Sequence, residues 1–235
     1  MQSRLLYRDA LMLVIDKPAG LAVHKGPKGG TSLEDYFNAL RFGLPRAPAL
    51  AHRLDRDTSG CLVLGRHRKA LADLGKLFKR GDIGKTYWAV VEDGPAEPEG
   101  RIDIPLGRLD ETRGWWMKPD PKGQPAATIW KVMGRANGET WLALEPLTGR
   151  THQLRVHCAA MGWPVVGDNI YGSAPRTGGP VLHLHSREVV VPLYKNREAI
   201  RVIAPPPGHM HARLLACGWN GEAKGAMAPA ALPNQ

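Results

Sequence analysis

Cysteines and long apolar runs are both scarce in this sequence. The three cysteines are odd in number and widely spaced, at positions 61, 158 and 217. This pattern argues against the disulfide framework that small secreted domains use. The longest apolar run near the start, residues 10–15, spans six residues between two aspartates. Such a run is too short for a signal peptide or a membrane span, so we expect a cytoplasmic protein with no membrane contact.

Acidic residues are also few, because 22 Asp and Glu stand against 32 Lys and Arg, which leaves a formal charge of +10. An excess of cations favours a polyanionic partner, since each Lys or Arg that meets a phosphate releases a condensed counterion. The alternative is a basic surface that only keeps the protein dissolved. Seven basic residues cluster within residues 66–85 against two acidic ones, and this local concentration favours nucleic acid.

Motifs that bind nucleotides, cofactors or metals are absent from the sequence. It contains neither Gly-x-x-x-x-Gly-Lys nor Gly-x-Gly-x-x-Gly, so no nucleotide or dinucleotide cofactor is indicated. Histidines occur in pairs, at 183 and 185 and at 152 and 157, but without Cys, Asp or Glu at ligand spacing, and no metal is expected. Residues 57–60, Asp-Thr-Ser-Gly, differ from the aspartic protease turn by a serine before the glycine, and no second such turn completes a carboxylate pair.

Asp55 is the first candidate for chemistry. It lies between Arg53 and Arg56, just before an apolar run. A carboxylate with cations nearby stays ionised, and it can then act as a nucleophile or a base. The alternative is an aspartate that only caps or ion-pairs in a turn.

Apolar patterning predicts one α+β domain over residues 1–220, followed by a disordered tail at 221–235. A helix is expected to start at Ser32, with Asp35 completing its cap. A helix over 151–161 is expected to begin near Thr151 and to turn Met161 toward the core. The expected strands are 12–16, 61–64, 86–91, 128–132, 140–145 and 189–191, and a further helix carries its apolar stripe on Ala70, Leu71, Leu74, Leu77 and Phe78.

Three other segments carry polar or aromatic groups of interest. Tyr87 opens a strand beside Lys85, a pairing suited to stacking on a base near its phosphate, although it is equally typical of an ordinary sheet aromatic. Residues 149–157 place two arginines near the start of a helix, which suits an anion. Residues 167–172, Gly-Asp-Asn-Ile-Tyr-Gly, are interpreted as an ordered turn with a structural role.

Taken together, these segments resemble the RluA family of pseudouridine synthases. Residues 52–60, His-Arg-Leu-Asp-Arg-Asp-Thr-Ser-Gly, are similar to the active-site motif of that family, and the resemblance covers about residues 10–205. His52 favours this branch over the related RsuA branch. Three further blocks agree in order and spacing, at residues 16–24, 85–87 and 149–168. Residues 182–186 are similar to a late block of the family, with Ser186 where alanine is usual.

The resemblance implies a fold, an activity and a partner. The fold is a bent, mixed and mostly antiparallel sheet with flanking helices and a central basic cleft. The activity is the isomerisation of a uridine in tRNA or rRNA to pseudouridine, with no metal and no cofactor. We expect a monomer that lacks the S4-type RNA-binding domain of many members. The alternative is an RNA-binding module of the same fold that has lost turnover.

The resemblance also assigns roles to residues. Asp55 is the catalytic carboxylate, Tyr87 stacks on the uracil, and Arg155 is the ion-pair partner that keeps Asp55 ionised, with Arg150 as the second choice. The target nucleotide must be flipped out of its stem, and Arg53 could fill the vacated stack. The expected RNA-binding residues are Arg53, Arg150, Lys85, Lys76, Lys79 and Arg80, and Leu184 is expected to line the pocket.

Overall fold

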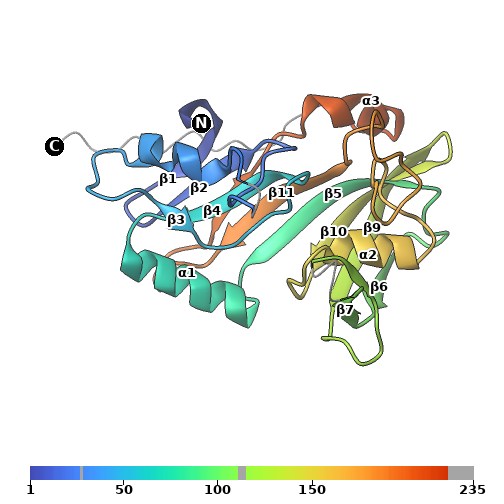
Figure 1. Cartoon of the computed structure of the whole chain (residues 1–235), viewed down its shortest axis with the longest axis horizontal. Helices are drawn as coiled ribbons and strands as arrows, with labels where there is room; N and C mark the ends of the chain where they lie inside the picture. The colour runs from blue at the N-terminus through green and yellow to red at the C-terminus, as the bar shows by residue number, and fades with distance from the viewer. Residues whose placement is uncertain (27–28, 111–114, 222–235) are drawn as a thin grey trace. The chain divides into compact units, whose positions relative to one another are not determined.

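The computed structural model describes residues 1–26, 29–110 and 115–221, so the expected tail lies almost entirely outside the described residues. The chain forms two compact units, and Figure 1 labels most of their helices and strands. Unit 1 comprises Met1–Gly84 and Ser186–Pro206, and unit 2 comprises Lys85–His185 and residues 207–221. Asp55 therefore belongs to unit 1, whereas Tyr87 and Arg155 belong to unit 2.

Unit 1 contains a sheet in the order β1-β2-β4-β11, in which β3 pairs with β4 and β12 pairs with β11. All seven residues of β4 are buried, as expected for a continuous apolar strand that is covered on both faces. The strands are β1 (Leu5–Arg8), β2 (Met12–Lys17), β3 (Ala49–Leu50), β4 (Ser59–Gly65), β11 (Leu184–Val191) and β12 (Ile200–Ile203).

Helical segments in unit 1 begin and end where the sequence provides caps. Helix α1 (Arg68–Arg80) starts at His67, whose side chain accepts from the Ala70 amide, and ends at Gly81 in the left-handed conformation. The segment expected from Ser32 is confirmed as helical, but η2 (Leu33–Leu40) is a 3₁₀ helix. At its two ends the Asp35 amide donates to the Ser32 carbonyl and the Arg41 amide to the Asn38 carbonyl, and bonds between residues three apart define a 3₁₀ helix. A short 3₁₀ turn, η1 (Gln2–Arg4), opens the chain.

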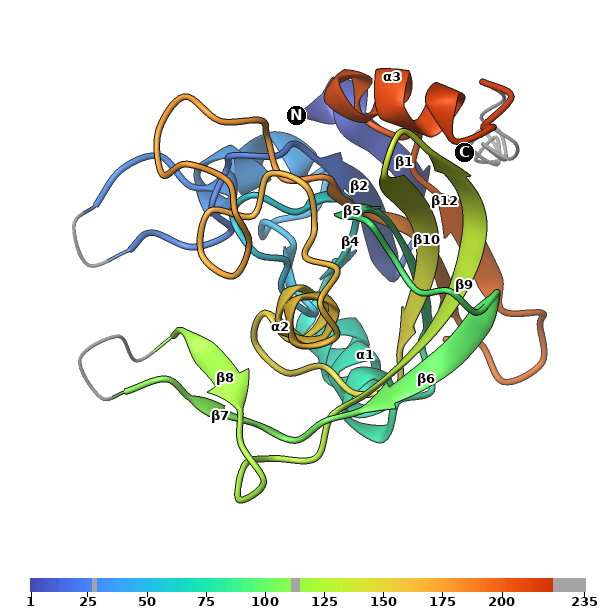
Figure 2. The same ribbon diagram turned by 90° about the vertical axis from the view of Figure 1, so that its right-hand side faces the viewer.

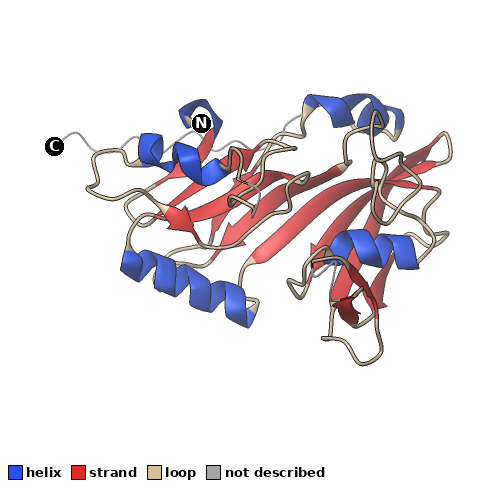
Figure 3. Ribbon diagram, in the orientation of Figure 1, coloured by secondary structure: helices blue, strands red, loops and turns tan. Residues whose placement is uncertain are grey.

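Unit 2 contains a second run of antiparallel strands in the order β5-β10-β9-β6, with a separate ribbon of β7 and β8. The predicted hairpin between β9 and β10 is confirmed, because Asn137 and Gly138 both adopt positive φ, at 55° and 73°. Figure 3 shows these long strands in red. Their bounds are β5 (Gly84–Glu92), β6 (Glu99–Asp103), β7 (Leu106–Arg108), β8 (Met117–Pro119), β9 (Ala127–Ala136) and β10 (Glu139–Pro146).

Two helices pack within unit 2. Helix α2 (Gln153–Ala160) lies inside the curve of β6, β9 and β10, as Figure 2 shows. Helix α3 (Gly208–Ala216) packs its Met210 and Leu214 against Val90 and Trp141. Its C-terminal end approaches β9 so closely that a Cβ on Gly134 would lie 1.7 Å from the Cys217 carbonyl oxygen, so only glycine fits there.

Two details expected of helix α2 are wrong. The helix was expected to begin near Thr151, but it begins at Gln153, and its N-cap residue is His152 in the left-handed conformation at φ 53°. Met161 is 45% exposed rather than in the core. The helix ends at Ala160, and Gly162 with φ 86° redirects the chain, so the spacing that buries Leu154 and Cys158 no longer holds at Met161.

The expected fold class, a mixed and mostly antiparallel sheet with flanking helices, is confirmed. The three cysteines of the chain are free thiols and are buried. Their wide spacing had argued against a disulfide framework. Among the helices that the structure describes, none is long and apolar enough to cross a membrane.

Candidate active site

Asp55 lies half-buried in the loop that leads into β4. The start of this loop is anchored by His52, whose Nε2 accepts from the Val63 amide at 3.0 Å. The His52 ring also stacks on Phe78 of α1, with 4.4 Å between ring centroids. Leu54 is buried beside Asp55. The loop is therefore held against both β4 and α1 immediately before the aspartate.

Lys17 anchors the same loop immediately after the aspartate. The side chain is 0% exposed, and its Nζ donates to the carbonyl oxygens of Pro18, Leu21 and Arg56 at 2.8, 2.7 and 2.8 Å. An ammonium group has three donors, and here each has an acceptor. The turn at residues 18–21 and the loop at Arg56 are thus joined through one cation.

Lys17 also places a charge close to the aspartates of the loop. Burial lowers the pKa of Lys17 to about 8, against the opposing charges of Asp57, Asp55 and Asp16. No role for Lys17 was predicted from the sequence. The available signal was a lysine at the end of a strand, directly before Pro-Ala-Gly.

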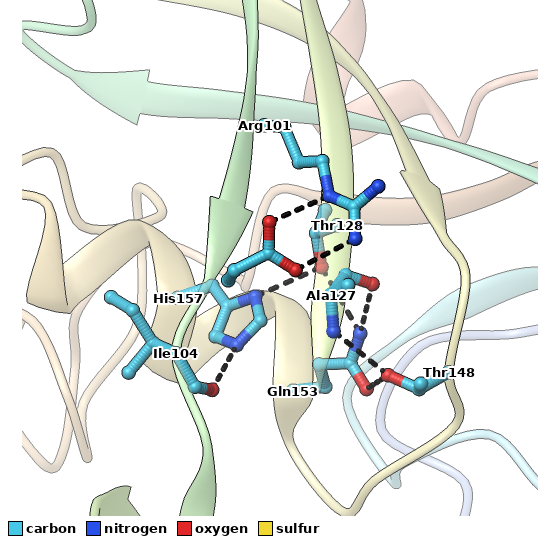
Figure 4. Close-up of polar contacts among 8 residues, drawn as sticks. Arg101, Ile104, Ala127, Thr128, Thr148, Gln153 and His157 are labelled. Carbon is cyan, nitrogen blue, oxygen red and sulfur yellow. Dashed lines mark hydrogen bonds and ion pairs between the residues drawn. The ribbon is translucent and has the colours of Figure 1, made fainter. Parts of the chain in front are cut away.

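Helix α2 is attached to unit 2 by a network of polar side chains, shown in Figure 4. The Gln153 amide nitrogen donates to the Ala127 carbonyl and to Thr128 Oγ1, at 2.9 and 3.1 Å. Its amide oxygen accepts from Thr148 Oγ1 at 2.7 Å and from the Arg150 amide at 3.0 Å. Gln153 therefore ties the first turn of the helix to β9 and to the preceding loop.

His157 extends this network one helical turn later. Its Nε2 lies 3.0 Å from the Ile104 carbonyl oxygen, and its Nδ1 lies 2.9 Å from Thr128 Oγ1. Burial lowers the pKa of His157, which favours a neutral ring. Since a carbonyl only accepts, Nε2 carries the proton and Nδ1 accepts from the Thr128 hydroxyl.

The opposite side of helix α2 carries Arg155. Residues four apart share a helix face, so Gln153 and His157 point one way and Arg155, midway between them, points another. Arg155 forms a bidentate ion pair with Asp168, with Nε–Oδ2 and Nη2–Oδ1 distances of 2.7 Å each. The two side chains are only 4% and 0% exposed. The polar network thus sets the rotation of the helix, and Asp168 sets the direction of the guanidinium group.

The pKa of Asp168 reflects this environment. Burial alone would raise it, but the hydrogen bonds and charge of Arg155 and the amides of Tyr171 and Ile170 outweigh burial and hold the pKa below its usual value. The ion pair therefore contributes stability above the pKa of a free aspartate, and this contribution is lost only as acid protonates the folded carboxylate.

The remaining candidates lie on regular elements or next to them. Tyr87 is buried on β5, opposite Leu144 of β10. Lys85 precedes it on the same strand, and burial lowers the pKa of its ammonium group. Leu184 is buried at the start of β11. Arg150 precedes α2, and its Nε donates to the Pro125 carbonyl at 3.1 Å.

The exposed cations include Arg53 in the Asp55 loop and Lys76, Lys79 and Arg80 of α1. On α1, Lys76 lies 3.4 Å from Asp73, and Arg80 lies 2.8 Å from Asp82 just beyond the helix. Such exposed pairs are weak and break readily. These lysines and arginines therefore remain available to phosphates, although two of them have a local competitor.

One exposed aromatic surface was not anticipated from the sequence. Trp115 is 56% exposed, and its ring meets His152 edge to face at 5.4 Å. Arg176 lies over the neighbouring Trp116 at 5.3 Å. Residues 115 and 116 lie far from residues 152 and 176 in the sequence, so no local pattern indicated this grouping. In the part of the chain that the structure describes, no three His, Cys, Asp or Glu side chains gather as a metal site.

A family model described as RNA pseudouridylate synthase matches residues 11–160, which include the Asp55 loop and helix α2. The chain belongs to this family. The resemblance to the RluA family is thereby confirmed, and the chain is a pseudouridine synthase, an isomerase.

Similar proteins agree with this assignment. An uncharacterized RNA pseudouridine synthase of Zymomonas mobilis is 45% identical over 190 residues, which cover 79% of this chain and 87% of the relative. Ribosomal large subunit pseudouridine synthase D of Nitrosomonas europaea is 37% identical over 77% of this chain, which spans about half, 54%, of that relative. The structure of human RNA pseudouridylate synthase domain containing 4 aligns with a TM-score of 0.75 at 26% identity, covering 89% of this chain and 92% of that one.

The role of Lys17 can be tested by Lys17→Met, which keeps most of the side-chain volume and removes the three donors. Each buried carbonyl left without a donor costs about 1–3 kcal/mol, so we expect the free energy of unfolding in urea to fall by about 3 kcal/mol. Lys25→Met is the matched control, because Lys25 is an exposed lysine whose ion pair is with the exposed carboxylate of Asp35, and it should barely change stability.

A comparison of the wild type with Lys17→Met over a range of pH tests the pKa of Lys17. The folded state has the lower pKa, about 8 against the ordinary 10.5, so it binds fewer protons than the unfolded state between these values. The free energy of unfolding of the wild type should therefore rise relative to Lys17→Met from pH 8 to 10, by at most about 1.4 kcal/mol per pH unit. A difference that stays flat over this range contradicts the lowered pKa.

Proposed function

We propose that this pseudouridine synthase isomerises a uridine in structured tRNA or rRNA, with Asp55 as its catalytic carboxylate. The observation that carries the proposal is the Asp55 loop itself. Its nine-residue motif matches that of the family, and the loop is anchored on one side of the aspartate by His52 and on the other by Lys17. A catalytic group must be held in a fixed place, and this loop meets that requirement without regular secondary structure.

The chemistry needs little beyond a carboxylate and a closed pocket. The N1–C1′ bond of the uridine breaks, the uracil turns, and C5 bonds to C1′; the C5 proton leaves to a base or to solvent, and N1 gains a proton. The product is an isomer of the substrate, so the net reaction consumes no electrons and no high-energy group. An ionised Asp55 can stabilise or trap the intermediate as a nucleophile or a base.

We assign the supporting roles by the same resemblance. Tyr87 stacks on the uracil, and Arg155 is the cation for the catalytic carboxylate. The target base leaves its stack to reach the aspartate, and Arg53, exposed in the same loop, takes its place. Leu184 lines the pocket. The relative from Nitrosomonas europaea is named as a synthase of the large ribosomal subunit, which supports rRNA as one substrate class.

Asp55→Asn is the direct test of this assignment. The amide has nearly the same shape as the carboxylate but cannot act as nucleophile or base. We expect folding and RNA affinity to persist and the single-turnover rate to fall by at least about 10²-fold. The measurement is new pseudouridine in total RNA, detected by mass spectrometry, with Asp57→Asn alongside. Substantial turnover by Asp55→Asn together with a loss in Asp57→Asn would move the chemistry to Asp57.

We also propose that the exposed cations of α1 contact phosphates rather than bases. Changing Lys76, Lys79 and Arg80 together to Ala should weaken RNA binding and flatten its salt dependence by about 0.7–0.9 log units per lost contact. Saturating RNA should restore most of the single-turnover rate. An unchanged salt slope would mean that RNA lies on another face.

A second variant, which removes acidic residues next to these cations, should change RNA binding in the opposite direction. Asp73→Asn with Asp82→Asn removes the carboxylates that pair with Lys76 and Arg80. If these cations meet RNA, the double variant should bind more tightly at low salt and show a steeper salt dependence. Weaker or equal binding would contradict the contact.

The alternative, an RNA-binding module of the same fold without turnover, differs from an active enzyme in whether the protein forms new pseudouridine. It would show salt-dependent RNA binding by the wild type and the same pseudouridine content with and without protein. The motif aspartate, the strand tyrosine and the arginine of α2 are all present, which favours an active enzyme.

A further inference from the structure

Asp168 lies in the turn at residues 167–172 and is among the most buried charged groups of unit 2. Its Oδ1 accepts from Arg155 Nη2 at 2.7 Å and from the amides of Ile170 and Tyr171 at 2.9 and 3.0 Å. Its Oδ2 accepts from Arg155 Nε at 2.7 Å. This carboxylate is saturated with donors, and two of them come from the side chain of one arginine.

The backbone of the turn is fixed to the strand that carries Tyr87. The Asp168 amide donates to the Val165 carbonyl at 3.0 Å, and the Val166 amide donates to Val90 of β5 at 2.9 Å. Gly167 has φ 81°, and a Cβ there would lie 2.4 Å from the Val181 carbonyl oxygen. The turn is therefore packed too tightly for any larger residue at that point.

Tyr171 completes the hold on Arg155. Its ring lies under the guanidinium carbon at 5.2 Å, a cation–π arrangement. Its hydroxyl accepts from the Met117 amide at 2.9 Å and lies 2.8 Å from His152 Nδ1. The guanidinium group is thus gripped at one edge by Asp168 and along one face by an aromatic ring that is itself tethered.

We propose that Asp168 is a positioning residue for the isomerase reaction, acting through Arg155 and linking it to the strand of Tyr87. This inference rests on the proposed roles of those two residues. Asp168 binds the Nε and Nη2 edge of the guanidinium group, and in the proposed role the Nη1 amino group, which lies outside this pair, is the donor to the catalytic carboxylate. The turn at residues 167–172, which was interpreted from the sequence as structural, then sets the direction of the bond from Arg155 to the catalytic carboxylate.

A carboxylate at position 168 also determines the charge that Arg155 presents. The pair is neutral overall, and in a buried setting each partner is costly without the other. Arg155 therefore acts as an aimed donor rather than as an uncompensated cation. Replacing Asp168 by a neutral residue should weaken the aim of Arg155 and free its charge.

Asp168→Asn is the principal test, since it keeps the shape of the side chain and removes its charge. We expect RNA affinity to remain while the single-turnover rate falls by up to about 10²-fold, the loss that a misplacement of 1 Å can cause. The acid limb of the rate profile should move to lower pH, because an uncompensated Arg155 holds the catalytic carboxylate ionised further into acid. A role confined to stability would move neither the rate of the folded enzyme nor the profile.

Glu139→Gln provides the matched control. Glu139 of β10 pairs with Arg213 of α3 in the same unit, and the substitution is again carboxylate to amide. It should lower the melting temperature without changing the rate or the pH profile of the folded enzyme. Asp168→Glu keeps the charge but displaces the carboxylate, so it should lose rate with no shift of the acid limb, and it serves if Asp168→Asn does not fold.

A double-mutant cycle with Arg155→Gln decides whether Asp168 acts through Arg155. We expect the double variant to be no slower than Arg155→Gln alone, and nitrogen-detected spectra of the Arg155 Nε–H group to lose its protected signal in Asp168→Asn. Additive losses would overturn the positioning role, as would an Asp168→Asn enzyme as fast as Glu139→Gln. A wild type that forms no pseudouridine would instead overturn the proposed function, while the Nε–H signal would still report on the ion pair.

Discussion

A fully buried ammonium group cannot remain without acceptors, and the arrangement of unit 1 around Asp55 depends on how Lys17 meets that constraint. Its three acceptors are carbonyls from two segments, Pro18 and Leu21 on one side and Arg56 on the other. Because all three bonds share one nitrogen, the turn and the loop keep a fixed spacing. An irregular segment thus gains the rigidity that strands and helices obtain from their own backbone bonds.

Unit 2 meets the corresponding problem with side chains on a short helix. Helix α2 has only eight residues and no side-chain cap, so little of its stability comes from the helix itself. Gln153 and His157 bond to β9 and to the chain after β6, and each of their polar atoms has a partner. A fully satisfied polar network specifies one arrangement, whereas an apolar face would tolerate rotation. That specificity is what leaves Arg155 on the opposite side, aimed at the turn.

The sequence predicted what depends on local pattern. The Asn137-Gly138 hairpin, the apolar stripe of α1 and the start of η2 at Ser32 were all legible from residues within a few positions of each other. It could not predict contacts between distant residues, such as Lys17 with Arg56, 39 positions apart, or Arg155 with Asp168, 13 apart. Periodicity also failed at Met161, because the helix ends one residue earlier, at Ala160, and Gly162 then redirects the chain. The family motif named Asp55, but how that residue is held became evident only from the folded chain.

The balance of charge around Arg155 has a consequence for an enzyme whose substrate is a polyanion. An uncompensated arginine in the interior of unit 2 would be an attractive site for any phosphate of the RNA, since phosphates bind guanidinium groups in the same bidentate way as carboxylates do. Asp168 already occupies the Nε and Nη2 edge, so a phosphate would have to displace a buried and fully bonded carboxylate. The exposed cations of α1 have only weak surface partners, and phosphates can displace these at little cost. Attraction for phosphates is therefore stronger at the surface, while Asp168 occupies the bidentate edge of the interior arginine.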